Sequence, residues 1–335
     1  MAAAFRIHGR IGSWLVLAGA LAAATAAASP AGAETTGLII VSNEKSNTLS
    51  ILDASDSVVR TVQTCGRPRG MKFSANRRQF YVGCGDDNTI AIYELATLKL
   101  VKRYRDIADP ETFDLHPNGH DLYISNEDDS ETTVLNVETG EITARYETGA
   151  EPEGVLITPD GKLVFVASEA ANIVHVIDVA AKKIVKNILV GTRPRRFALR
   201  PDGKELWVSA ELSGEVNIID LSKLEVVTSI VFAPPAIRRD QVTPVDVLIT
   251  RDGRRAYVAL GRANRVAVVD VPTRTVSDFI LVGKRPWGLQ LTRDEKKLYV
   301  ANGLSDDISI IETASRRVTK SVPVGIVPYA ILIDD

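Results

Sequence analysis

Charged and aromatic side chains follow a proline that recurs through the chain at a nearly constant interval. The residues directly after this proline are Arg69, Glu111, Glu153, Arg195, Val245, Trp287 and Tyr329. Successive members are 42 residues apart, except for one interval of 50. Arginine guanidinium groups bind carboxylates in a bidentate geometry, and aromatic faces stack on planar rings. If the fold brings these positions together, they and the neighbouring Arg196 suit a small anionic ligand.

A second set of acidic residues recurs at almost the same interval. It consists of Glu44, Glu127, Glu169 and Glu211, with glycine at positions 85, 261 and 303. Carboxylates are the ligands that hard cations such as calcium prefer. The four glutamates are therefore candidate metal ligands or catalytic bases. The alternative is that these acids pair with the nearby arginines around a solvated rim.

The repeat that carries these residues predicts the fold. Each unit contains four short segments rich in Val, Ile and Leu, as in the unit from Pro152, where they cover 154–158, 163–168, 173–178 and 184–190. Turns such as Pro159-Asp160-Gly161 separate the first two segments, because Pro presets φ and Gly tolerates a positive φ. Seven units of four strands predict an all-β, seven-bladed β-propeller.

The two ends of the ring are expected to meet. Residues 38–43 have the pattern of a second strand and residues 329–333 that of a first strand. The C-terminal strand would therefore join the N-terminal blade and leave no unpaired inner edge. This predicts a single domain over residues 34–335. It also contains one insertion of eight residues around positions 234–241, expected on the same face as the two recurring series.

The first 33 residues have the pattern of an export signal. Arg6, His8 and Arg10 precede an apolar run over 11–28, and Ala31-Gly32-Ala33 matches a signal-peptidase site. We expect cleavage before Glu34 and export to a bacterial periplasm; an uncleaved membrane anchor is the alternative. No later stretch is long and apolar enough to span a bilayer, so the mature chain should have no membrane span.

Cys65 and Cys84 are the two cysteines of the chain. Cys65 precedes the first strand of its unit and Cys84 ends the second strand, so both are expected at the same end of adjacent segments. The periplasm is oxidising, which favours a disulfide between them. Two buried thiols are the alternative.

Several common kinds of chemistry are absent from the sequence. The chain has 40 Lys+Arg and 42 Asp+Glu, which provides no basic excess for nucleic acid. After the leader, His116, His120 and His175 are too far apart to suggest a zinc or multi-histidine copper site. CxxCH, GxSxG, P-loop and HExxH motifs are also missing. We therefore expect a protein that is not an enzyme.

Each unit carries a version of one tetrapeptide, for example Tyr123-Ile124-Ser125-Asn126 and Tyr299-Val300-Ala301-Asn302. These resemble the motif of YVTN-repeat β-propellers. More narrowly, residues 42–53, 66–71, 201–211 and 259–270 resemble the β-propeller group associated with PQQ-dependent catabolism. This resemblance implies an exported seven-bladed propeller found beside PQQ-dependent alcohol oxidation and an associated transporter. It implies no defined catalytic reaction.

Taken together, these observations predict an exported propeller that binds a small anionic ligand or docks a periplasmic partner. The resemblance suggests PQQ as ligand, and a PQQ-dependent dehydrogenase or a transporter component as partner. A hard cation such as calcium is the other candidate cofactor. Two alternatives remain: a metal-assisted, lactonase-like hydrolase that uses the recurring carboxylates, and a structural interaction scaffold.

Overall fold

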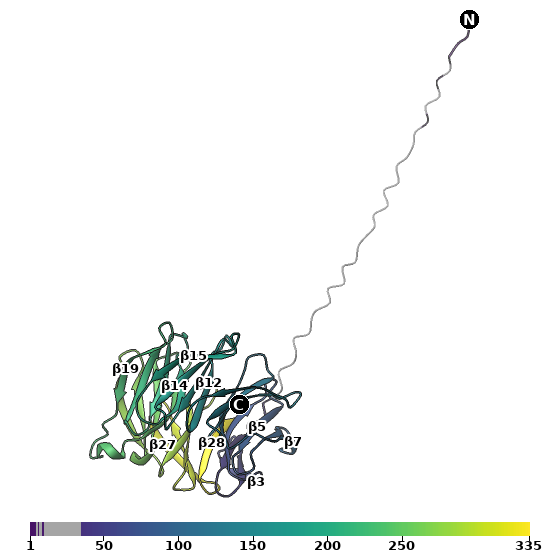
Figure 1. The fold of residues 1–335 in the computed structure, drawn as a ribbon. Helices are drawn as coiled ribbons and strands as arrows, with labels where there is room; N and C mark the ends of the chain where they lie inside the picture. Colours follow the sequence, from purple (N-terminus) through teal and green to yellow (C-terminus); the bar gives the residue numbers. More distant parts are fainter. Residues whose placement is uncertain (5, 7–8, 10–34) are drawn as a thin grey trace. The chain divides into compact units, whose positions relative to one another are not determined.

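The computed structural model describes residues 1–4, 6, 9 and 35–335 (Figure 1). The predicted cleavage site before Glu34 and the apolar run preceding it lie outside the described residues. Among the residues that are described, no helix is both long and apolar enough to cross a membrane.

Residues 35–335 form seven four-stranded antiparallel sheets, which are the blades of a propeller. We number the blades by strand order: β28-β1-β2-β3 is blade 1, β4–β7 is blade 2, and the numbering continues to β24–β27, which is blade 7. The predicted all-β, seven-bladed architecture is therefore confirmed.

The innermost strand of each blade begins at the repeat proline. These strands are β4 (Pro68–Phe73), β8 (Pro110–Leu115), β12 (Pro152–Ile157), β16 (Pro194–Leu199), β20 (Pro244–Ile249), β24 (Pro286–Leu291) and β28 (Pro328–Ile333). The second strands are β1 (Ile39–Asn43), β5 (Gln79–Cys84), β9 (Asp121–Asn126), β13 (Leu163–Ser168), β17 (Glu205–Ala210), β21 (Arg255–Leu260) and β25 (Lys297–Asn302).

The remaining strands lie farther from the axis. The third strands are β2 (Thr48–Leu52), β6 (Thr89–Glu94), β10 (Glu131–Asn136), β14 (Ile173–Asp178), β18 (Glu215–Asp220), β22 (Arg265–Asp270) and β26 (Asp307–Glu312). The outermost strands are β3 (Val58–Gln63), β7 (Leu100–Tyr104), β11 (Ile142–Glu147), β15 (Lys183–Leu189), β19 (Glu225–Val231), β23 (Thr275–Leu281) and β27 (Arg317–Pro323). Two short 3-10 helices complete the described elements: η1 (Arg239–Gln241) and η2 (Gly261–Ala263).

The core lies between adjacent blades. The second and third strands are buried along almost their whole length, whereas outermost strands such as β15 are mostly exposed. Apolar residues of neighbouring blades pack together; for example, Tyr123 of blade 3 lies in one cluster with Val164 of blade 4. Successive residues of an inner strand point to opposite faces of the blade, and a neighbouring blade covers each face. Both sets of side chains are therefore buried.

The C-terminal strand closes the ring, as expected. β28 pairs with β1 in antiparallel register, with Ile39 opposite Ile333 and Ile40 opposite Leu332. In Figure 1 the yellow β28 lies among the purple strands of the N-terminal part of the propeller. Beyond β28, Asp334 accepts hydrogen bonds from the Thr36 backbone N–H at 2.7 Å and from Arg77 at 2.7 Å. The inner edge of blade 1 is therefore paired.

Each innermost strand has an irregular register just after its proline. In blade 4, Pro152 pairs with Ser168, but the regular pairing resumes only at Val155 opposite Val166. The residues in between leave the ladder, and the motif serine of the preceding blade donates to a carbonyl there: Ser125 of blade 3 donates to the Glu153 carbonyl oxygen at 2.6 Å. This irregularity lets the residue after the proline differ in direction from an ordinary strand residue.

The insertion lies between β19 and β20, in the connection that contains η1. Phe232, Ile237 and Val242 anchor this connection to the core cluster that contains Ala263 of η2. Because η2 follows a second strand, the insertion lies on the face where the recurring charged positions are found.

Cys65 and Cys84 are joined by a disulfide, with their Cα atoms 5.6 Å apart. Both residues are buried. The bridge ties the connection that precedes β4 to the end of β5.

Candidate functional site

Three recurring positions of the repeat lie at one end of the central channel, which we call the channel mouth. They are the residue before the repeat proline, the residue after it, and the residue that follows the second strand. In six of the seven blades described, the N–H of the residue after the second strand donates to the carbonyl of the residue before the proline. In those six blades the residue before the proline has a positive φ: Arg67, Asp109, Glu151, Arg193, Arg285 and Val327. This conformation is unusual for residues other than glycine, and the recurring hydrogen bond maintains it.

The channel mouth contains a polar cavity of about 440 Å³. Four of the predicted anion-binding residues line it, together with three of the predicted acidic ones: Arg69, Glu153, Arg195, Trp287, Glu44, Glu127 and Glu169. Positions that are far apart in sequence are therefore brought together as the repeat predicted. Larger grooves occur between blades near the outer surface, for example one of about 650 Å³ around Tyr299, but they gather fewer charged groups.

Arg195 lies at the centre of a buried ion-pair network. Its guanidinium group lies 3.1 Å from Glu153, 2.5 Å from Glu169 and 3.3 Å from Glu211. Arg195 is 2% exposed, and the three glutamates are also buried. Many of the mouth charges are thus paired with one another, which agrees with the self-pairing alternative, while the cavity above them remains open.

Two of the predicted ligand-binding residues face a different space. Tyr329 donates a hydrogen bond to Glu153 at 2.7 Å, and Arg196 contacts both Glu153 and the Tyr329 hydroxyl. Arg196 and Tyr329 line a second cavity of about 240 Å³, which Asp246 also lines, and do not line the mouth cavity. Arg69 lies over the Tyr329 ring, 4.4 Å from its centroid. Arg69, Arg196 and Tyr329 therefore form the floor of the mouth cavity rather than an open ligand surface.

The side of the mouth formed by Arg193, Arg195, Arg285 and Trp287 is the basic corner. Arg195 and Arg285 lie over the indole at 5.0 and 4.8 Å from its ring. Arg285 pairs with Glu211 at 2.7 Å. Burial lowers the pKa of Arg285, and the charges of Arg262, Arg195 and Arg193 lower it further against the opposing effect of Glu211. Burial is the main cause of the lowered pKa, and three other arginines lie close enough to Arg285 to contribute.

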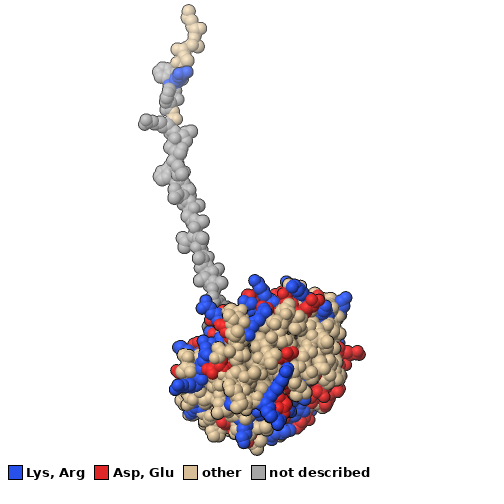
Figure 2. Space-filling view, turned by 90° about the vertical axis from the view of Figure 1, so that its left-hand side faces the viewer, with Lys and Arg blue, Asp and Glu red and all other residues tan. Residues whose placement is uncertain are grey.

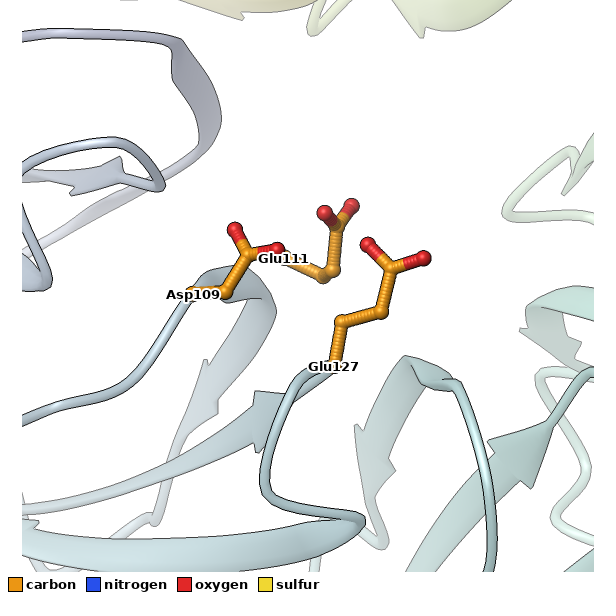
Figure 3. A group of neighbouring side chains, drawn as sticks. All are labelled: Asp109, Glu111 and Glu127. Atoms are coloured by element: carbon orange, nitrogen blue, oxygen red, sulfur yellow. The ribbon is translucent and has the colours of Figure 1, made fainter.

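The opposite side, formed by Asp109, Glu111 and Glu127, is the acidic corner. One oxygen of each carboxylate lies within 4.8 Å of the others, and Figure 3 shows the three groups converging. Arg67 contacts all three: it lies 3.0 Å from Asp109 and 3.2 Å from Glu127, and it also pairs with Glu111. Arg69 pairs with Glu111 as well.

Burial and the neighbouring arginines act in opposite directions on the pKa values of the acids at the mouth. It raises the pKa of Glu169 to about 7, although Arg195 and Arg193 oppose the shift. It raises the pKa of Glu111 well above its usual value, with help from the Glu153 charge, and it raises the pKa of Asp109. For Glu153 burial acts in the same sense, but Arg195, Arg196 and Arg69 outweigh it and lower its pKa.

The four glutamates predicted as metal ligands do not form one group. Glu169 and Glu211 contact Arg195, whereas Glu44 and Glu127 lie within ion-pair distance of Arg69. The acids that converge in the described part of the chain are those of the acidic corner, of which Glu127 was predicted as a metal ligand and Glu111 as part of the anion site. The sequence signal for this crowded corner was the glycine at position 85, where the other blades of the series can carry glutamate. A Cβ at Gly85 would lie 2.6 Å from Asp109 Oδ1.

The outer surface has no comparable separation of charge in the view shown. Figure 2 shows acidic and basic side chains interspersed over the presented face, in keeping with the near-equal totals of 42 Asp+Glu and 40 Lys+Arg.

Solved structures share the fold at low sequence identity. A functionally unknown protein from Desulfotomaculum acetoxidans aligns with a TM-score of 0.75 and 15% identity over 89% of this chain and 99% of its own. A candidate 6-phosphogluconolactonase from Bacteroides fragilis aligns with a TM-score of 0.74 and 19% identity over 92% and 100%. Hydrazine synthase of Kuenenia stuttgartiensis aligns with a TM-score of 0.71 and 19% identity over 78% and 88%. Such identities support a common fold and no shared activity.

A search among curated proteins finds no match to the sequence. The sequence model of the YNCE-like β-propeller family matches residues 33–290, which is most of the propeller. The repeat, the closed ring of seven blades and this match agree, and the chain belongs to the YNCE-like β-propeller family.

Proposed function

We propose that the protein is an exported, non-enzymatic binding protein that holds a small anionic ligand at the basic corner of the channel mouth. The observation that carries this proposal is the buried Nε1 of Trp287, which has no hydrogen-bond partner among the described residues. Nε of Arg195, in the same corner, is likewise buried without a hydrogen-bond partner. Buried donors are rarely left unpaired, so an acceptor from a ligand would stabilise this corner.

The guanidinium groups of the basic corner favour a carboxylate as that acceptor. Arg285 lies close to Arg193, Arg195 and Arg262, so a ligand carboxylate would meet several guanidinium groups there. Hydrogen bonds from arginine to carboxylate are among the stronger polar contacts in proteins. The indole of Trp287 offers a face for a planar ligand, in a cavity of about 440 Å³.

Glu169 provides a way to make room for the ligand. It contacts Arg195 at 2.5 Å and Arg193 at 2.7 Å, so in its charged form it occupies the donors that an anion would use. Its pKa is raised to about 7 by burial. On protonation Glu169 loses its charge, and the two arginines become available to a ligand carboxylate.

The resemblance to propellers associated with PQQ-dependent catabolism supports a specific ligand class. PQQ is a planar, polycarboxylate quinone and fits the chemistry of the basic corner; a carboxylate intermediate of alcohol oxidation is the second ligand within the proposal. Docking to a periplasmic PQQ-dependent dehydrogenase or to a transporter component would deliver or receive such a ligand.

N-terminal sequencing of protein from the periplasmic fraction tests the proposed export. The sequence obtained should begin at Glu34.

Calorimetric titration with PQQ tests the proposed binding function. We expect Arg285→Ala and Trp287→Ala each to weaken binding about tenfold or more, equivalent to about 1.4 kcal/mol. Arg238→Ala is the matched control, because Arg238 is an exposed arginine of the insertion that pairs with Asp240. Absence of binding by the wild type, or equal binding by all three variants, would contradict the proposal. Arg69 and Arg195 are unsuitable test positions because each is buried against glutamates and its loss would remove an ion-pair partner from them.

A hydrolase is the second candidate, and the raised pKa of Glu169, about 7, favours it because a general base works best near the ambient pH. The fold shared with a candidate 6-phosphogluconolactonase makes lactones the substrates to test first. Lactone hydrolysis measured with and without a chelator discriminates between the two. Turnover that Glu169→Gln abolishes would establish the hydrolase in place of the binding protein.

A further inference from the structure

We propose that Asp109, Glu111 and Glu127 form a binding site for a divalent cation of the calcium type, and that Arg67 occupies this acidic corner as a built-in substitute until the metal displaces it. The site lies across the mouth from the basic corner, and cation binding at the acidic corner does not require the anion that we propose at the basic corner.

The geometry of the three carboxylates suits a single ion. One oxygen of each lies within 4.8 Å of the other two. Calcium–oxygen bonds are about 2.4 Å long, so two ligands on opposite sides of one calcium ion are about 4.8 Å apart. Figure 3 shows the three side chains pointing toward a shared space. All three come from blade 3, where Glu127 donates its backbone N–H to the Asp109 carbonyl at 3.2 Å.

A second observation points to a missing ligand. Asp109 is 5% exposed and Glu111 is 0% exposed. Even so, Asp109 Oδ1 and Glu111 Oε2 are buried and accept no hydrogen bond from any described residue. A buried carboxylate oxygen without a partner is costly. Arg67 and Arg69 leave these two oxygens without a donor, and a cation bound by the same carboxylates would compensate their buried charge.

Arg67 is suited to leave when a metal arrives. Its side chain is 19% exposed, compared with 3% for that of Arg195, and it lines the open mouth cavity. Arg69 remains beside Glu111 as part of the cavity floor. Asp86 and Asp128 also line the cavity and offer acceptors for the displaced guanidinium group. Exchange of the Arg67 guanidinium group for a divalent cation replaces one positive charge by two. The three carboxylates of the acidic corner favour this exchange, because Arg67 and Arg69 neutralise them only in part.

The ligand chemistry favours calcium over other divalent ions. The set consists only of carboxylate oxygens, without histidine or thiolate, which disfavours zinc and copper. The three protein ligands leave positions for water on the side of the mouth cavity. Magnesium requires near-ideal octahedral geometry and loses its water reluctantly, so it should bind more weakly than calcium.

Calcium titration by calorimetry tests the site on the intact propeller. We expect Arg67→Gln to bind calcium about tenfold more tightly than the wild type, because the internal competitor is removed. Asp109→Asn and Glu127→Gln should each weaken binding about tenfold or more. Glu151→Gln is the matched control: Glu151 occupies the position equivalent to Asp109 one repeat later, but it is exposed, and its loss should leave calcium binding unchanged.

The same variants define the results that would overturn the inference. No calcium binding by wild type or by Arg67→Gln at about 1 mM, the weak end for extracellular calcium modules, would refute the site. Binding that is unchanged in Asp109→Asn and Glu127→Gln would place the ion elsewhere. Circular dichroism of each variant verifies folding, and Glu127, the most exposed of the three at 30%, is the variant least able to disturb the fold. PQQ titration of Arg67→Gln shows separately whether the basic corner binds its anion.

Discussion

At the scale of single residues, two buried acids that contact the same arginine have different environments. Glu153 and Glu169 both contact Arg195 and both are buried. The pKa of Glu153 is nevertheless lowered, because Arg196 and Arg69 add to Arg195, whereas that of Glu169 is raised to about 7 because burial outweighs its two arginines. We therefore expect Glu153 to stay charged at neutral pH and Glu169 to change its charge near pH 7.

This difference predicts a pH dependence of anion binding. As the pH falls from about 8 to about 6, Glu169 gains a proton and stops competing for Arg193 and Arg195, so the affinity for PQQ should rise. In Glu169→Gln the affinity should equal that of the protonated wild type at both pH values. Calorimetric titrations at the two pH values measure this. A decrease in affinity on acidification, or an equal pH dependence in Glu169→Gln, would contradict the role of Glu169.

The unfolding free energy should change with pH in the opposite sense to that expected for an acidic residue in a favourable ion pair. The folded-state pKa of Glu169, about 7, lies above the ordinary value of 4.5, so the native state binds the proton more tightly than the unfolded state. The contribution of Glu169 to stability therefore falls as the pH rises from about 4.5 to about 7. Urea unfolding of the wild type and of Glu169→Gln measures this. The unfolding free energy of the wild type should fall relative to that of the variant as the pH rises across this range. A constant difference would contradict the raised pKa.

At the scale of elements, the innermost strands place the charged positions, and short connections hold them. Two features hold Glu153 at the mouth. One is the register irregularity after Pro152, and the other is the hydrogen bond that Ser125 of the preceding blade donates to the Glu153 carbonyl. The disulfide between Cys65 and Cys84 restrains the connection that carries Arg67. The position of the acidic corner thus depends on backbone contacts within and between blades.

The disulfide should stabilise the protein measurably. It joins residues that are 19 positions apart, and a loop of this size corresponds to about 3 kcal/mol in the chain-entropy account. The double variant Cys65→Ser, Cys84→Ser should lose about this much unfolding free energy in urea denaturation. A reducing agent should destabilise the wild type by a similar amount and leave the double variant unaffected. Equal stability with and without the bridge would show that it does not restrain the unfolded chain.

At the scale of the whole molecule, closure depends on residues from both ends of the ring. β28 pairs with β1, and Asp334, which is 2% exposed, binds Thr36 and Arg77. Without β28, the buried strand β1 would become an exposed edge, which favours aggregation. The ring is therefore expected to unfold as one unit from this junction.

Two variants of different severity test the closure. Deletion of residues 328–335 should abolish cooperative unfolding and yield aggregated protein. Asp334→Ala keeps the strand but removes the acceptor, and should cost about 1–3 kcal/mol of unfolding free energy. Asp294→Ala is the control, since Asp294 is an exposed turn residue paired with Lys296. A soluble deletion variant with the wild-type melting temperature would contradict the proposed importance of closure.

Much of the fold could be predicted from the sequence because the signals are local and repeated. The proline marks the start of every innermost strand, and apolar alternation marks the others, so seven blades and the joining of β28 to β1 followed directly. The same register predicted that Arg69, Glu153, Arg195 and Trp287 would line one cavity. The leader, its cleavage and the link to PQQ-dependent catabolism remain predictions.

The tertiary structure alone decided how the charges are distributed. Arg196 and Tyr329 belong to a second cavity, and of the four glutamates predicted as metal ligands only Glu127 joins the converging acids Asp109 and Glu111. These outcomes depend on how side chains from different blades share a narrow channel, and a repeat specifies only where each backbone position lies. Whether an arginine there is paired, and whether a carboxylate keeps its proton, follows from burial and from neighbours that lie multiples of the repeat away along the chain.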